Sequence, residues 1–255
     1  MSRFVITAPV IILAAAAAPA AAQDANWSGV YVGVHGTMSD VDADWTGTNI
    51  YQSVDGAEGG FTTSQTANTF SHRLSGSEIG GSGRVGFNFQ TGSFVVGAEA
   101  DAMFFNFTEA VTVTTPRATY TLVSDASNLQ TVRARAGCAA GRALFFVTGG
   151  VAFSNLDHSL TATNVNQIII DGGEGGGSTI GTSPSTLAAT ASSGTGVAFG
   201  GGGEFQINDT MSVALTALRI DFGSEDLADS APPSSISAMV DSKMLVGMIG
   251  LNLRF

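Results

Sequence analysis

Cysteine and charge are both scarce in this sequence, and each scarcity excludes a class of protein. The single cysteine, Cys138, excludes a disulfide-stapled fold, and its distance from the amino terminus excludes a lipid-anchored lipoprotein. Charged residues make up 12% of the chain, against roughly 25% in ordinary soluble domains. Because the mean hydropathy is nonetheless positive, the composition does not fit a disordered chain either.

The amino-terminal residues have the pattern of a cleaved secretory signal peptide. Arg3 supplies a positive start, residues 5–18 are uncharged and mostly apolar, and the alanines at 20–22 fit an A-x-A cleavage site. A membrane anchor is disfavoured because the apolar segment is short and ends in small residues. We therefore expect residues 1–22 to be removed and residues 23–255 to form one exported domain.

The last stretch, residues 243–255, alternates between two faces with a period of two. One face carries Leu253, Leu251 and Ile249, while the other carries Asn, Gly, Met and Arg side chains. This period indicates a strand, and its apolar face is close to the roughly 9–11 residues that a tilted strand needs to cross a bilayer. Because every backbone group in lipid needs a partner within the protein, a membrane strand implies a closed barrel.

Seven further segments alternate in the same way. The eight predicted strands are residues 27–38, 79–90, 94–103, 129–138, 143–153, 193–206, 210–222 and 243–255. Short turns at 90–93, 139–142 and 208–209 alternate with long connections at 39–78, 104–128, 154–192 and 223–242. In bacterial outer-membrane barrels the short turns are periplasmic and the long loops extracellular. We predict an all-β, eight-stranded antiparallel transmembrane up-and-down β-barrel with four long extracellular loops.

Acidic residues are concentrated in the predicted loops. The four long connections hold 15 of the 21 acidic residues and two of the ten basic residues, which gives them a net charge of −13. We expect an acidic surface outside the cell and a nearly neutral barrel. Nucleic acid is excluded as a partner, because its binding depends on neutralisation of phosphates by Lys and Arg.

Charged residues of opposite sign face the predicted interior from neighbouring strands. These residues are Arg84, Glu99, Asp101, Arg133, Arg135 and Glu204. A buried charge is tolerated when it is paired, and adjacent strands supply the partners. We interpret the group as a salt-bridged plug rather than a catalytic cluster.

The facing of Arg219 and Asp221 is left open, because the alternation of their strand would put both charges on the lipid side.

Several sequence motifs resemble one known family. They are W-S-G-V-Y-V-G at 27–33, R-V-G-F-N-F-Q at 84–90, V-V-G-A-E-A-D at 95–101, V-R-A-R-A-G at 132–137, F-V-T-G-G-V-A-F at 146–153 and the terminal L-N-L-R-F. On these motifs the chain resembles the proteobacterial outer-membrane immunogenic proteins, which are porin-like surface antigens with an OmpA-type eight-stranded barrel. The resemblance brings no catalytic residues to this chain. It also implies that the barrel-assembly machinery recognises the strand ending at Phe255.

Three functions are compatible with these observations. The first is a structural, surface-exposed outer-membrane protein that supports the envelope and presents acidic loops; an eight-stranded barrel is just wide enough for its own side chains. The alternative is a narrow channel for small solutes, because interior glycines leave space. A lipid-modifying enzyme would need Ser71-His72 or His158-Ser159 at the outer lipid rim, but adjacent residues on a strand point to opposite faces.

We therefore expect no enzyme and no cofactor. No metal site is expected, because the three histidines lack metal-ligand spacing. The expected location is the outer membrane of a Gram-negative bacterium, reached through the periplasm, with outer-membrane lipid as the surroundings. Any extracellular ligand, the oligomeric state and the role of Cys138 are left open.

Overall fold

The computed structural model describes residues 25–57, 60–114, 118–172, 178–231 and 234–255. The predicted signal peptide, residues 1–22, lies outside this part of the chain. The described residues form eight strands: β1 (Gly29–Ala57), β2 (Gly60–Thr91), β3 (Phe94–Thr114), β4 (Ala118–Ala140), β5 (Ala143–Gly172), β6 (Ser178–Gln206), β7 (Met211–Ala231) and β8 (Ser234–Arg254).

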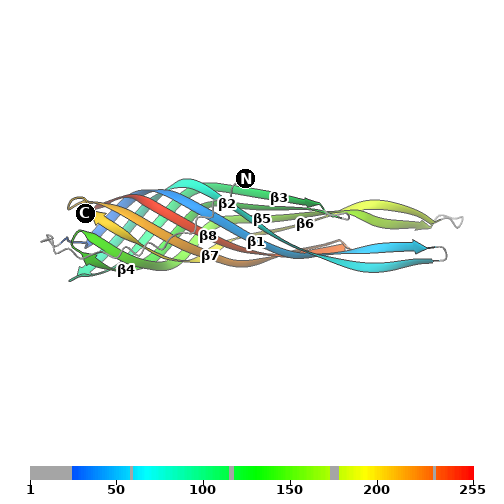
Figure 1. The fold of residues 1–255 in the computed structure, drawn as a ribbon, viewed down its shortest axis with the longest axis horizontal. Coiled ribbons are helices and arrows are strands. Elements are labelled where there is room, and N and C mark those ends of the chain that lie inside the picture. Colours follow the sequence, from blue (N-terminus) through cyan, green and yellow to red (C-terminus); the bar gives the residue numbers. More distant parts are fainter. Residues whose placement is uncertain (1–24, 58–59, 115–117, 173–177, 232–233) are drawn as a thin grey trace.

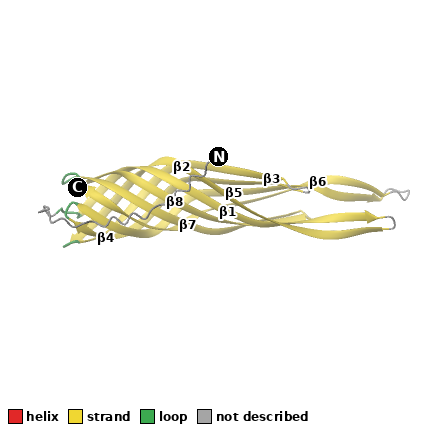
Figure 2. Ribbon diagram, viewed as in Figure 1, coloured by secondary structure: helices red, strands yellow, loops and turns green. Residues whose placement is uncertain are grey.

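The strands form a closed antiparallel barrel. Each strand pairs with the next one along the chain, and β8 closes the ring by pairing with β1, from Tyr31↔Arg254 to Ile50↔Ser235. Figure 2 shows strand along nearly all of the described chain, with loops gathered at one end. The carboxyl terminus lies at that end as well (Figure 1). The predicted fold class, strand number and strand order are confirmed.

Side chains alternate between a buried interior and an apolar outer wall, as the period of two predicts. On β8, Ile249 is 60% exposed and its neighbour Met248 is 1% exposed. We call the outward-facing apolar residues of the wall the apolar band. The band includes Val30, Val32, Val34, Val85, Phe87, Phe89, Val96, Phe104, Val132, Val147, Val151, Phe153, Phe199, Val213, Leu215, Ile249, Leu251 and Leu253.

Strand β7 carries both Arg219 and Asp221 on its outer face. Arg219 is exposed on the outer wall, and Asp221 follows it on the same face with partial exposure. Arg219 is paired with Leu245, and Asp221 with Lys243, where the wall changes from apolar to charged residues. Arg219 therefore lies at the rim of the apolar band, where its long side chain can reach water.

The four long connections need correction, because most of their residues are paired strand rather than loop. β1 and β2 pair continuously out to Ala57↔Gly60, and β5 and β6 out to Gly172↔Ser178. Polarity and length indicated loops, but where their side chains are described, these segments bury one face against an apolar core, with residues such as Trp45, Leu74 and Leu160, and turn the other face to water. An antiparallel partner and one buried face are sufficient to hold such a chain as a strand.

The barrel closes fully only at the level of the apolar band. Pairing between β2 and β3 ends at Gly81↔Phe104, and pairing between β6 and β7 ends at Val197↔Asp221. Beyond these points the strands form two four-stranded sheets, β7-β8-β1-β2 and β3-β4-β5-β6, seen as two arms in Figure 1. Lipid requires closure because it cannot hydrogen-bond an open strand edge, whereas water can.

The two sheets face each other over an apolar core, and we call this region the outer sandwich. Its core is built from inward-facing residues of seven strands. They are Ala43, Trp45, Leu74, Ala118, Tyr120, Leu122, Leu160, Ala162, Leu187, Ala189, Leu227, Ile236, Ala238 and Val240.

Candidate functional site

The interior of the barrel holds a compact ionic network in which the predicted partners meet. Arg84 Nε lies 2.6 Å from Asp101 Oδ1, and Arg133 Nη2 lies 3.1 Å from Glu99 Oε1 and also contacts Asp101. Arg135 Nη2 lies 3.2 Å from a Glu204 carboxylate oxygen. All six side chains are at most 1% exposed. Three guanidinium groups therefore neutralise three carboxylates, and the predicted salt-bridged plug is present.

Two further side chains, those of Tyr31 and Arg254, extend this network beyond the six predicted residues. The Tyr31 hydroxyl donates to Glu99 Oε2 at 3.0 Å and accepts from Arg135 Nη1 at 2.8 Å. Arg254 Nη2 lies 3.7 Å from Glu204 Oε1, and its guanidinium stacks over the Trp27 ring. The alternation places Tyr31 and Arg254 on the inward face, but a single sequence does not indicate which inward residues touch.

The interior glycines make room for neighbouring side chains rather than for a passage. A Cβ on Gly86 would lie 2.3 Å from Tyr31 Cζ, because the phenol ring lies across that glycine. A Cβ on Gly97 would lie 2.5 Å from Asn88 Oδ1, and one on Gly250 would lie 2.5 Å from the His35 ring. The space that favoured a channel in the sequence analysis is filled at these positions.

Apolar layers lie on both sides of the ionic network. Trp27, Val95, Leu144 and Phe146 pack together toward the short turns. On the other side, inward-facing residues of every strand except β2 form a larger cluster. It consists of Val41, Met103, Phe105, Phe107, Ala126, Leu129, Ala152, Leu156, Ala198, Leu218, Ile220, Phe222, Met244, Val246 and Met248.

A histidine bridges the two sheets at the base of the outer sandwich. Ser124 Oγ lies 3.0 Å from His158 Nδ1, and Ser242 Oγ lies 3.1 Å from Nε2. Trp45 Nε1 donates to the same Ser124 hydroxyl at 3.1 Å. His158 thus connects β4 and β5 of one sheet to β8 of the other. His158 is 3% exposed, and this burial lowers the pKa of its imidazole below the usual value.

The two serine–histidine pairs considered for an enzyme do not form dyads. Ser71 is exposed on the outer face of β2 while His72 lies on the opposite face, and the same holds for exterior-facing Ser159 and buried His158. His158 instead meets Ser124 and Ser242, which are distant in sequence. These hydroxyls are 2% and 5% exposed, so a substrate in solution does not reach them.

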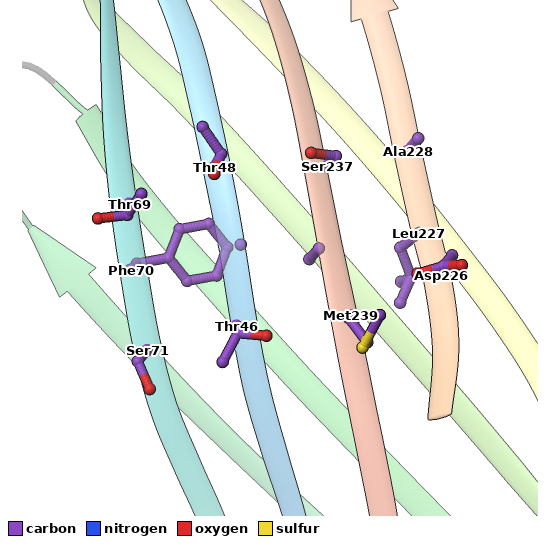
Figure 3. Close-up of a pocket in the computed structure, with 12 residues that line it drawn as sticks. Thr46, Thr48, Thr69, Phe70, Ser71, Asp226, Leu227, Ala228, Ser237 and Met239 are labelled. Atoms are coloured by element: carbon purple, nitrogen blue, oxygen red, sulfur yellow. The ribbon is translucent and has the colours of Figure 1, made fainter. Parts of the chain in front are cut away.

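One hollow of about 770 Å³ lies on the outer sandwich, across strands β2, β1, β8 and β7 (Figure 3). Its polar lining comes from Thr46, Thr48, Thr69, Ser71, Asp226 and Ser237. Hydroxyl groups and one carboxylate form this lining, and the described lining residues include no Lys or Arg. The hollow therefore does not have the charge of an anion site.

The described residues hold neither a clustered set of metal ligands nor a membrane-spanning helix. Residues 25–255, outside the gaps given above, contain no group of three or more His, Cys, Asp or Glu placed to hold a metal ion. The same residues contain no helix long and apolar enough to cross a membrane. Cys138 is a free thiol, exposed near the turn between β4 and β5.

Comparison with protein families gives one match. A family model described as "Outer membrane protein beta-barrel domain" matches residues 8–243, which is most of the chain. No curated protein sequence matches.

Solved structures give similarities of fold. Ail, the attachment invasion locus protein of Yersinia pestis, in complex with the heparin analogue sucrose octasulfate, is 11% identical, with 86% of this chain and 99% of that chain covered and a TM-score of 0.36. Neisserial surface protein A is 10% identical (85% and 97% covered, TM-score 0.31). The Escherichia coli outer-membrane protease OmpT is 10% identical (88% and 97% covered, TM-score 0.27). At these values the similarities carry no conclusion about activity.

Proposed function

Because the chain belongs to the outer-membrane β-barrel family of Gram-negative bacteria, we propose that it is a closed, structural barrel that supports the envelope and presents an acidic surface outside the cell. The observation that carries this proposal is the filled interior. The ionic network lies between two apolar layers, and the side chains of Arg133, Leu129 and Leu218 are among the largest fully buried ones.

A continuous water path would have to pass through each of these layers. The apolar layer outside the ionic network is formed by 15 buried residues, so an ion entering it would exchange its hydration shell for a lining that is mostly apolar, with few hydroxyls such as those of Ser39 and Ser82. The ionic network offers no free charge to a solute either, because its guanidinium and carboxylate groups are already paired. Both features support a closed barrel rather than the alternative of a narrow channel.

Conductance measurement tests this proposal directly. Purified protein, folded in detergent and inserted into planar bilayers, should give no discrete current steps, while a general porin inserted by the same procedure should give them. Liposome swelling with small sugars should likewise proceed at the rate of protein-free vesicles. Reproducible current steps from protein that shows the heat-modifiable gel migration of a folded barrel would favour the channel and refute the closed barrel.

The enzyme alternative has one supporting observation, the contact between Ser242 and His158 Nε2. An activated serine needs an accessible hydroxyl and donors for an oxyanion, whereas this serine is buried in the interior. We expect no labelling of the folded protein by a serine-directed fluorophosphonate. Labelling that disappears in Ser242→Ala but persists in Ser71→Ala would overturn this expectation.

We also propose that the barrel-assembly machinery binds the closing strand at Phe255. This side chain is 80% exposed, and its backbone N–H donates to Val30 O at 2.9 Å, where β8 meets β1. Deletion of Phe255 should reduce the amount of assembled barrel in cells, while detergent refolding of the purified variant should be affected less. Equal loss in both assays would mean that Phe255 stabilises the barrel and is not a recognition signal.

A further inference from the structure

The outer sandwich has an open side between β2 and β3. Beyond the pair Gly81↔Phe104, described residues 105–114 of β3 pair with β4 alone, and residues 60–80 of β2 pair with β1 alone. We call this side the β2–β3 seam. At its inner end the strands still touch, because a Cβ on Gly76 would lie 2.8 Å from the Phe107 ring. Farther out, described residues 105–114 of β3 form a strand edge with no strand paired on the seam side.

The apolar core of the outer sandwich reaches the surface at this seam. Its fully buried residues lie in the middle of the two sheets, while Phe70, Val111 and Val113 pack against them and remain only partly buried. Phe70 lies on the β2 side of the seam, and the two valines lie on the β3 side. None of these three residues has a neighbouring strand on the seam side, which leaves each of them partly exposed; Ala191, on the β6 side of the opposite seam, is partly buried as well.

The opposite seam, between β6 and β7, is protected. Asp229 Oδ2 accepts a hydrogen bond from the Ala188 N–H at 2.9 Å, so a side chain of β7 occupies a backbone donor of the β6 edge. Glu225 and Asp226 add charge to the β7 edge. Charged residues on an edge oppose the addition of another strand.

The β3 edge has little of this protection. Residues 107–114 read F-T-E-A-V-T-V-T, with one charged residue, no proline and no lysine. β-Branched residues predominate, and they are the ones that pack well in sheets. Thr108, Ala110, Thr112 and Thr114 face water, while Val111 and Val113 face the core.

We propose that the β2–β3 seam is a docking site for one extended strand of a partner protein, which adds to the β3 edge by main-chain hydrogen bonds. Strand addition gives affinity through the backbone and specificity through alternate side chains. The partner strand is apolar at every second position, where its side chains cover Val111 and Val113. It lacks acidic residues near the edge, because Glu109 and the surrounding acidic surface repel them, and basic residues flank it.

A defined peptide tests the proposal on the full mature protein in detergent or lipid nanodiscs. The peptide alternates valine and threonine between lysines, and its control carries N-methyl groups on alternate amides, which removes the donors without changing the side chains. We expect the first peptide to bind and to slow amide hydrogen exchange in residues 105–114. We expect the methylated peptide to bind at least about tenfold more weakly, because it lacks the main-chain N–H donors on alternate residues. A tenfold change in Kd corresponds to about 1.4 kcal/mol.

Paired variants locate the site. Val111→Lys with Val113→Lys places two charges under the incoming strand and should weaken binding about tenfold or more. Thr121→Lys with Thr119→Lys adds the same two charges on β4 opposite Thr112 and Thr114, away from the edge, and should leave binding unchanged.

Three results would overturn the proposal. They are equal binding of the two peptides, exchange protection outside the seam, and a self-associated protein whose seam is already protected by a second copy. The two peptides need only the unmodified protein, so the test remains decisive even where the double variant does not fold.

Discussion

Arg133 lies at the centre of the ionic network, and its environment decides what its removal costs. Its guanidinium contacts both Glu99 and Asp101, and all three side chains are fully buried. An ion pair of this kind contributes little net stability compared with apolar residues, but loss of one partner leaves a buried charge without compensation.

Replacement of Arg133 by alanine should therefore destabilise the folded barrel by about 3–5 kcal/mol. The measurement is equilibrium unfolding in lipid vesicles, together with heat-modifiable gel migration. Arg73→Ala is the matched control, because its ion pair with Asp44 is exposed and should be worth about 1 kcal/mol or less. If Arg133→Ala and the wild type unfold together, the network does not hold the interior.

Ile249 and Met248 test the lipid-facing assignment at adjacent positions. Ile249 is exposed on the apolar band and Met248 is buried in the interior. Arginine on the lipid face near mid-bilayer costs roughly 2–4 kcal/mol, so Ile249→Arg should lower the unfolding free energy in lipid by that amount. Met248→Gln should cost less, because its neighbours include the polar groups of Arg84 and Thr216. If Met248→Gln lowered the unfolding free energy more than Ile249→Arg, the inward and outward assignments of all side chains in the barrel would be exchanged.

For single residues, the sequence predicts whether a side chain points into the barrel or out of it. It does not predict which inward side chains touch one another. A period of two places Glu99, Asp101, Arg133 and Arg135 inside, and neighbouring strands bring them within reach of each other. Contacts between strands that are not neighbours, such as Ser242 with His158, depend on the curvature of the wall. That curvature has no local sequence signal.

At the scale of the elements, the bridge at His158 makes the outer sandwich sensitive to pH. Burial lowers the pKa of His158 in the folded state, and its ring nitrogens meet serine hydroxyls rather than carboxylates. The nearby acids, Asp157 on its own strand and Asp125 on β4, act in the opposite direction but are weaker than the effect of burial.

Because the unfolded chain takes up a proton at His158 more readily than the folded one, stability should fall as pH decreases through about 6.5. It should level off below the folded-state pKa. His158→Gln should show a shallower dependence between pH 7 and pH 5, measured by hydrogen exchange of the outer strands. His72→Gln, which alters a partly exposed histidine on β2, should keep the slope of the wild type. Parallel slopes for wild type and His158→Gln would exclude His158 as the cause.

The long strands were predicted only in part, for a physical reason. Within the apolar band, alternation of large apolar and small or charged residues is unambiguous, and the turns at 90–93, 139–142 and 208–209 were correctly placed. Outside it, both faces carry Thr, Ser, Gly and Asp, so hydropathy no longer separates strand from loop. The pairing of β1 with β2 out to Ala57↔Gly60 results from the hairpin itself and leaves little trace in composition.

At the scale of the whole molecule, the short turns and the long hairpins lie at opposite ends of the barrel (Figure 1). We predict that the turn at Gly92 is periplasmic and that the connection between β5 and β6 is outside the cell. An epitope tag inserted after residue 175 should be detected on intact cells, and a tag at Gly92 should be detected only after the outer membrane is permeabilised. Detection of the Gly92 tag on intact cells would reverse the orientation.

The splitting of the barrel beyond the apolar band also determines how the protein responds to a mechanical load. A force that pulls β2 sideways at the tip of the β1–β2 hairpin loads the hydrogen bonds to β1 one after another from the tip inward, because no strand is paired with residues 60–80 of β2 on their other side. The rupture must stop near Gly81↔Phe104, because from there each strand has two neighbours and the load is shared around the ring. The part outside the membrane can therefore yield at low force and recover, while the membrane seal remains intact.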